Sequence, residues 1–212
     1  MSKIALILGS SRTPSNGRGI ASWLTSVLKS RFNNSPTPNA DMEKKVNNLY
    51  RVCFVDPTVS PLPLGPIVDG SYMPSDIHNP DKYPSPAVQQ WSTFVSSCAG
   101  FVVLSPQYNW GYPGELKNVF DHLYWEWRGK PVMLVTYGGH GGNKSATLLR
   151  EVLGGGLKMK VLSKSVEITL PSAYIKGEEW VTGAHVPEFI AKHESSVGEA
   201  LEEMLQLLSA KA

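Results

Sequence analysis

The segment from Gly9 to Gly19 (GSSRTPSNGRG) gathers hydroxyl, amide and guanidinium groups just before a helical pattern begins. A helix N-terminus offers free backbone N–H groups and the positive end of the helix dipole, and both attract a phosphate. Ser10, Arg12, Ser15 and Asn16 would add donors to such a site. The spacing fits neither GxGxxG nor a Walker phosphate loop, which argues against those two nucleotide sites. The alternative is a solvated loop that only caps the helix.

A second segment, PQYNWGYPG at residues 106–114, combines aromatic side chains with amides and glycines. A planar ring with polar edges needs this mixture, because its faces lie on apolar groups and its edge binds amides or backbone. The candidates are Tyr108, Asn109, Trp110 and Tyr112. For Trp110 and Tyr112, a place in the core or in a subunit interface is nearly as good an interpretation.

A third segment, YGGHGG at residues 137–142, contains four glycines that allow the backbone to approach a ligand closely. His140 can polarise a substrate or donate to a ring, or it is a partly exposed loop residue without a special role. No Ser-His-Asp arrangement and no metal-ligand spacing accompanies these segments, so neither a catalytic side chain nor a metal ligand is predicted.

Each of the three segments follows a short apolar run of the kind that forms a buried strand. Such runs predict strands at residues 3–8, 50–55, 101–104, 131–136 and 160–168. Helical spacing predicts helices from near residue 17, around 87–97, after 113, over about 143–153 and near the C-terminus. This alternation predicts an α/β flavodoxin-like three-layer sandwich with a five-stranded parallel sheet of order 2-1-3-4-5. In that order the three segments converge at one edge of the sheet, where ligands of such folds bind.

Length and composition favour a single domain over residues 1–212, with 42% hydrophobic and 18% charged residues. A net charge of +2 without a dense Lys/Arg run argues against a nucleic-acid partner. The longest apolar runs are too short to span a bilayer or to form a signal peptide. We therefore expect a cytoplasmic protein in which Cys53 and Cys98 are buried thiols. The proline-rich stretch Pro57–Pro86 is expected to be an irregular surface excursion, with a linker as the alternative.

Taken together, GSSRTPS, PQYNWGYPGELKNVFD and YGGHGG resemble the NADPH-dependent FMN reductase family over most of residues 3–165. The likeness is greatest to its small quinone-reducing members, and PxYNxxxPxxLKNxxD is the most specific pattern. The resemblance implies that FMN is the cofactor. It implies a phosphate site formed by Ser10, Arg12, Ser15, Asn16 and Gly17. It further implies that the flavin ring is lined by Pro106, Gln107, Tyr108, Asn109, Trp110, Tyr137, Gly138, Gly139, His140 and Gly141.

One motif position differs from many family members, and three others fall outside the loops. Many family members have glutamate where this chain has Gln107, so any role of a carboxylate there is lost. Lys117, Asn118 and Asp121 belong to the motif but fall on a predicted helix, where packing or dimer contacts are expected.

The resemblance also implies an activity: FMN-dependent oxidation of NADPH or NADH with two-electron, ping-pong reduction of quinones, flavins, azo compounds or metal ions. The flavin would carry the hydride chemistry. A flavodoxin-type electron carrier and a flavin redox-sensing interaction protein are the alternatives. Family members form dimers or dimers of dimers, so a homodimer or homotetramer is expected. Trp110 and Tyr124–Trp127 are candidate interface groups, and a place in the core is an equally good interpretation of both.

Overall fold

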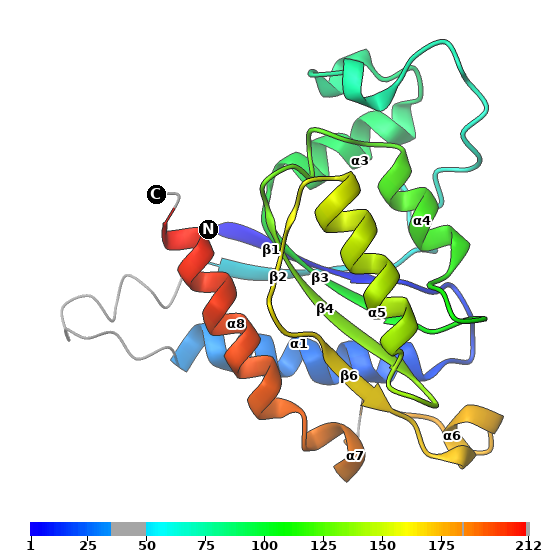
Figure 1. The fold of residues 1–212 in the computed structure, drawn as a ribbon, viewed down its shortest axis with the longest axis vertical. Coiled ribbons are helices and arrows are strands. Elements are labelled where there is room, and N and C mark those ends of the chain that lie inside the picture. Colours follow the sequence, from blue (N-terminus) through cyan, green and yellow to red (C-terminus); the bar gives the residue numbers. More distant parts are fainter. Residues whose placement is uncertain (35–49, 184, 211–212) are drawn as a thin grey trace.

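A computed structural model describes residues 1–34, 50–183 and 185–210 of the chain. Within these residues, parallel strands form one sheet of order β2-β1-β3-β4-β5, and β6 also pairs with β4 (Figure 1). The strands are β1 (Ser2–Leu8), β2 (Tyr50–Val55), β3 (Cys98–Pro106), β4 (Pro131–Gly138), β5 (Lys160–Val161) and β6 (Val166–Thr169). The predicted fold class and strand order are confirmed.

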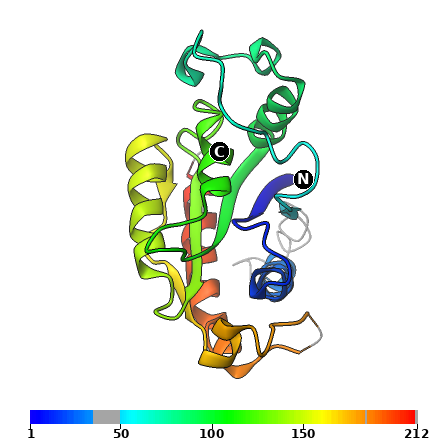
Figure 2. The same cartoon turned by 90° about the vertical axis from the view of Figure 1, so that its right-hand side faces the viewer.

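Helices cover both faces of the sheet, and Figure 2 shows α1 and α5 on opposite sides of it. One face carries α1 (Asn16–Asn34) and α8 (Glu194–Ser209), whereas the other carries α3 (Pro86–Ser96), α4 (Gly114–Asp121) and α5 (Asn143–Arg150). The strands supply both layers by alternation: in β1, Leu6 faces α1 and α8, and Ile7 faces the opposite layer. Because both faces are buried, the central strands are almost wholly apolar.

The prediction of one strand over residues 160–168 is wrong. β5 pairs with the beginning of β4 and β6 with its end, and residues 163–165 between them leave the ladder. The backbone groups of this junction bind side chains instead of a neighbouring strand. Arg150 donates to the Leu162 carbonyl (2.7 Å), and Glu203 accepts from the Ser163 N–H (2.8 Å). The two strands still occupy the same edge of the sheet, so the topology is unchanged.

Other boundaries differ in smaller ways. β3 begins three residues before the predicted strand and ends two residues after it. The helix predicted to end near residue 153 continues from α5 into a π-helical segment, η3 (Glu151–Gly156). Two short helices that were not predicted, α6 (Ser172–Lys176) and α7 (Glu188–Ala191), follow the last strand. None of the helices in the described part of the chain is long and apolar enough to cross a membrane.

The proline-rich segment after β2 has only two short 3-10 turns, η1 (Pro74–Asp76) and η2 (Pro80–Lys82). It packs on the core through buried Leu62 and Tyr83, as expected of a surface excursion rather than a linker. The Asn118 side chain of α4 donates to the Gly65 carbonyl in this segment (2.9 Å), which gives this motif residue a packing role.

The aromatic residues after α4 divide between core and surface. Trp127 is completely buried among Trp91, Phe101 and Phe120. Trp125 is partly exposed. Both cysteines are free thiols: Cys98 is buried, and burial raises its pKa to about 11, whereas Cys53 is only half-buried.

Candidate active site

The carboxyl ends of β1 and β3 meet at the point where the strand order reverses. From β1 the chain crosses to β2 on one side and later enters β3 on the other, and ligands of parallel α/β sheets bind at such a point. Ser10, after β1, and Tyr108, after β3, join across it through hydroxyl groups 2.9 Å apart. Ser10 also accepts a hydrogen bond from the Arg12 backbone N–H (3.2 Å), and the Arg12 guanidinium lies 4.4 Å from the centre of the Tyr108 ring.

Ser15 stands immediately before the first residue of α1, and its hydroxyl is buried without a hydrogen-bond partner among the described residues. An unpaired buried hydroxyl costs about 1–3 kcal/mol, and a ligand that accepts its hydrogen bond would remove this cost. The α1 N-terminus and the Arg12 side chain line the same pocket. A hydroxyl, a helix N-terminus and a guanidinium are together the donor set of a phosphate site, and the FMN phosphate fits it.

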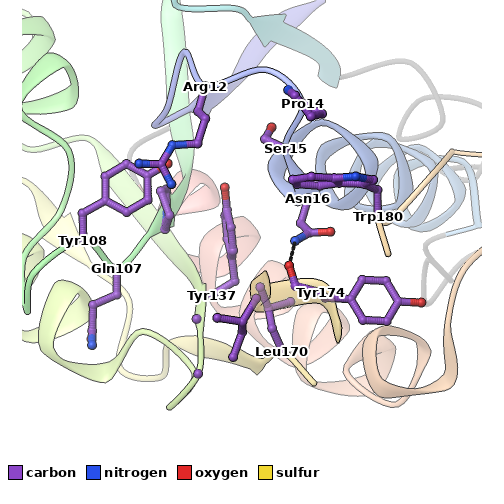
Figure 3. A pocket seen from close by; sticks show the side chains of 14 residues that line it. Arg12, Pro14, Ser15, Asn16, Gln107, Tyr108, Tyr137, Leu170, Tyr174 and Trp180 are labelled. Atoms are coloured by element: carbon purple, nitrogen blue, oxygen red, sulfur yellow. Dashed lines mark hydrogen bonds between the residues drawn. The ribbon is translucent and has the colours of Figure 1, made fainter. Parts of the chain in front are cut away.

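Tyr137 reaches this place from the end of β4. Its side chain is 5% exposed, and its hydroxyl points into the space between Arg12 and Ser15 (Figure 3). A Cβ atom on Gly17 would lie 2.4 Å from that hydroxyl, so Gly17 contributes by leaving room for it. Burial raises the pKa of the phenol, which keeps it protonated and able to donate. The sequence associated Tyr137 with the ring edge, whereas its hydroxyl faces the expected phosphate position.

Both ends of the Asn16 side-chain amide bind backbone groups. Its side-chain Nδ2 donates to the Tyr174 carbonyl (3.0 Å), and its Oδ1 accepts from the Val181 N–H (2.9 Å). The residue is 6% exposed. Asn16 therefore lines the pocket, but both ends of its amide bind the backbone of the segment that follows β6.

The loop after β3 forms a two-residue turn closed by two hydrogen bonds between Tyr108 and Gly111 (2.8 and 2.9 Å). Its central residues, Asn109 and Trp110, have φ values of 48° and 69°. Left-handed backbone is unfavourable for a bulky residue and is often kept at functional sites. Trp110 is 73% exposed, with Lys144 Nζ 5.6 Å from its ring centre. Both central residues lie outside the pocket lining.

Gln107 faces the pocket and caps the next helix. Its side-chain Oε1 accepts hydrogen bonds from the backbone N–H groups of Lys144 (2.9 Å) and Ser145 (3.4 Å) in the first turn of α5. α5 has no cap from its own N-cap residue, Gly142. The polar end of Gln107 thus replaces the missing cap, and this is a role that glutamate can perform equally well.

The glycine-rich loop after β4 contributes through its first half only. Gly138 and Gly139 line the pocket. Gly141 and Gly142 instead adopt left-handed backbone (φ 70° and 81°) to turn the chain into α5, where a Cβ would meet Glu167 or Thr136. His140 is exposed and lies outside the pocket lining.

These elements enclose a pocket of about 220 Å³ (Figure 3). It is lined by the predicted residues Arg12, Ser15, Asn16, Pro106, Gln107, Tyr108, Tyr137, Gly138 and Gly139. The predicted residues outside the lining are Ser10, Gly17, Asn109, Trp110, His140 and Gly141. Ser10 and Gly17 contact lining residues directly, through Tyr108 and Tyr137. Within residues 1–34, 50–183 and 185–210, no group of three or more His, Cys, Asp or Glu side chains could hold a metal ion.

Sequence reasoning missed a fourth side of the pocket. Pro14 completes the first loop, and Leu170, Tyr174, Ile175 and Trp180 follow β6. These last residues carry no motif. The available signal was their position, since they come directly after the carboxyl end of the last strand, where ligands of such sheets bind.

Comparisons with known proteins show the family of the chain. A profile of the NADPH-dependent FMN reductase family matches residues 2–170. The chain belongs to this family. It is 34% identical over 207 residues to an NAD(P)H-dependent FMN reductase of Saccharomyces cerevisiae, covering 98% of this chain and 95% of the relative. It is 38% identical over 169 residues to one of Schizosaccharomyces pombe, covering 80% and 74% of the two chains. At the level of the family, the predicted FMN cofactor and NAD(P)H donor are confirmed.

Solved structures support the fold. FerB, a flavoenzyme NAD(P)H:(acceptor) oxidoreductase from Paracoccus denitrificans, superposes with a TM-score of 0.59 at 15% identity, covering 96% of this chain and 99% of that one. An NADH:FMN oxidoreductase in its apo form gives a TM-score of 0.58 at 17% identity, covering 97% and 90%. Members of the FMN reductase family are oxidoreductases, so this chain is an enzyme of that class.

Proposed function

We propose that this chain binds FMN in the pocket between β1, β3 and β4 and transfers two electrons from NADH or NADPH to a small acceptor. The observation that carries the proposal is the buried, unpaired Ser15 hydroxyl at the N-terminus of α1, beside Arg12. No group of the described residues pairs with this hydroxyl, and a phosphate oxygen would accept its hydrogen bond.

The chain's own groups bind and orient rather than react. Bound FMN supplies the hydride chemistry, and the protein supplies position and electrostatics. Arg12 and Ser15 would hold the phosphate with Tyr137 as a further neutral donor, and Gly138 and Gly139 would let the backbone approach the ring. Tyr108 offers an aromatic face and is fixed by its hydrogen bond to Ser10. In balance, NAD(P)H and one proton reduce a quinone to a hydroquinone and leave NAD(P)⁺.

Donor and acceptor are proposed to use the same exposed face in turn, which is a ping-pong mechanism. Initial rates over a grid of NADPH and quinone concentrations would then give parallel double-reciprocal lines. Intersecting lines would show that both substrates bind together and would contradict the alternation. Quinones, flavins, azo compounds and metal ions are the acceptor classes to compare.

Photoreduction separates this enzyme from the two alternative functions. An electron carrier that shuttles single electrons accumulates a semiquinone, whereas a two-electron reductase passes from oxidised to fully reduced flavin without one. Because the net charge is +2, the chain also lacks the acidic balance expected of a carrier's docking surface. A redox-sensing partner protein would instead be found by a pull-down comparing oxidised and reduced protein.

We further propose a homodimer or homotetramer in the cytoplasm. Trp110 and Leu148 are 73% and 41% exposed, and such apolar surface favours association. Light scattering of the purified protein measures the oligomeric state directly, and a monomer at all concentrations would contradict the proposal.

A further inference from the structure

The fourth side of the pocket is formed by chain that follows the part matched by the family profile. That match ends at residue 170, and Tyr174, Ile175 and Trp180 lie beyond it. Ile175 and Trp180 are 56% and 38% exposed, although both are large and apolar. We refer to these two side chains as the apolar wall. Exposed apolar groups at the rim of a pocket mark a place where a ligand covers them.

The Asn16 side chain forms hydrogen bonds with the backbone at both ends of the segment that carries the apolar wall. Its amide binds the backbone of Tyr174 on one side and of Val181 on the other, over sequence separations of 158 and 165 residues. Val181 itself is buried, and its carbonyl lies so close to Gly19 that a Cβ there would be 2.0 Å away. The wall is thus attached to the same loop and helix that form the phosphate site.

Each side chain of the apolar wall lies close to a glycine. A Cβ on Gly139 would lie 3.2 Å from Ile175 Cδ1, so Ile175 covers the glycine loop that is expected to face the flavin. A Cβ on Gly177, which has left-handed backbone, would lie 3.1 Å from Trp180 Cζ2. Both side chains thus contact backbone on one side and line the pocket.

The two side chains of the wall favour a neutral ligand. Ile175 and Trp180 carry no charge and line the pocket. An uncharged planar ring can contact them without losing the hydration of a charge.

We propose that Ile175 and Trp180 bind the ring of a neutral, planar acceptor of the quinone class, and that Asn16 is the positioning residue that holds them. The inference rests on the proposed function. The bound quinone takes up a hydride and one solvent proton to become the hydroquinone, while NAD(P)H is oxidised to NAD(P)⁺. The wall contributes apolar contact to the quinone and no proton.

The test compares two acceptors in the FMN-loaded protein with NADPH in excess. The first, 2-methyl-1,4-naphthoquinone, is neutral and planar, whereas ferricyanide takes electrons without needing an apolar surface. Trp180→Ala and Ile175→Ala are each expected to lower kcat/KM for the quinone about fivefold to tenfold. Ferricyanide reduction and flavin content should stay as in the wild type. Trp125→Ala, which removes a tryptophan of similar exposure outside the pocket, should change neither.

A double-mutant cycle tests the role of Asn16. If Asn16 acts through the wall, Asn16→Ala lowers kcat/KM for the quinone and the double variant with Trp180→Ala is no worse than the poorer single variant. Additive effects, or loss of FMN in Asn16→Ala, would overturn the positioning role.

Equal losses for both acceptors, or loss of FMN in Trp180→Ala, would overturn the wall as an acceptor site. Failure of the proposed function is a separate result: the wild-type protein itself would then carry no FMN or oxidise no NAD(P)H.

Discussion

Tyr137 shows how burial prepares a single residue to bind an anion. Its pKa is raised by burial, so the phenol is protonated at every pH at which the protein would be assayed. Tyr137→Phe should raise the dissociation constant of FMN roughly tenfold, because a hydrogen bond to a charged group is worth about 1.5–3 kcal/mol. Riboflavin, which lacks the phosphate, should bind both proteins equally. Titration of the flavin-free protein with each compound measures this.

Tyr174→Phe is the matched control, because Tyr174 lines the same pocket with its hydroxyl directed away (Figure 3). If Tyr137→Phe weakens riboflavin as much as FMN, the hydroxyl contacts the ring or the ribityl chain rather than the phosphate.

Replacing Ser15 should affect the stability of the flavin-free protein and its affinity for FMN differently. Because its hydroxyl is buried and unpaired, Ser15→Ala should leave the flavin-free protein as stable as the wild type or stabilise it by up to about 1 kcal/mol. The same change should weaken FMN binding roughly tenfold. Denaturant unfolding of the flavin-free protein and FMN titration measure the two effects. A variant that loses stability but keeps its FMN affinity would show that the hydroxyl serves packing.

For single residues, the sequence predicted which residue types line the pocket better than it predicted the role of each residue. Hydroxyl and guanidinium groups before a helix point to a phosphate locally, so Arg12 and Ser15 could be found. The role of Asn16 depends on Tyr174 and Val181, far along the chain, and no local pattern contains that information. The same holds for Ile175 and Trp180, which are brought to the pocket by the path of the chain after β6.

Among the elements, α5 depends on a cap from another loop. Gln107→Ala should lower the free energy of unfolding by about 1 kcal/mol, since two N–H groups of α5 lose their acceptor. Gln107→Glu should keep the full stability or slightly exceed it, because a carboxylate at a helix N-terminus also interacts favourably with the dipole. Thermal unfolding compares the three proteins. Equal losses in both variants would contradict the capping role.

The ion pair between α1 and the residue after β2 should make the free energy of unfolding depend on pH in the acid range. Arg18 bonds Asp56 through both carboxylate oxygens (2.5 and 3.2 Å), and this hydrogen bonding lowers the pKa of Asp56 to about 2. An unfolded aspartate has a pKa of about 3.9, so the stabilisation is complete above about pH 4 and is lost as the pH falls through 2.

Asp56→Asn should therefore cost about 1 kcal/mol at neutral pH, a value reduced for the solvent screening of the half-exposed Arg18. Its free energy of unfolding should also fall less steeply than that of the wild type between pH 4 and pH 2. Parallel pH curves for the two proteins would show that the pair adds nothing.

The elements themselves were largely readable from the sequence. Continuous apolar runs and helical spacing gave the order and type of the main strands and helices, because both faces of this sheet are buried and its strands carry a strong signal. The sequence did not predict that the last strand is divided, because the division depends on Arg150 and Glu203. These distant side chains form hydrogen bonds with the backbone between β5 and β6. The short helix α6 also lacks a signal, as five residues are too few for a periodic pattern.

For the molecule as a whole, one topological fact explains the site. The strand order brings the ends of β1, β3 and β4 together (Figure 1). The segment after β6 completes the pocket. The residues of the family motif supply the expected cofactor side, whereas residues beyond the family match supply the apolar wall.

The most direct test is the visible absorption spectrum of the purified protein, followed by denaturation and identification of the released chromophore. The structure and the family predict flavin bands near about 370 and 450 nm and the release of FMN. A colourless protein that also fails to bind added FMN would contradict the central claim.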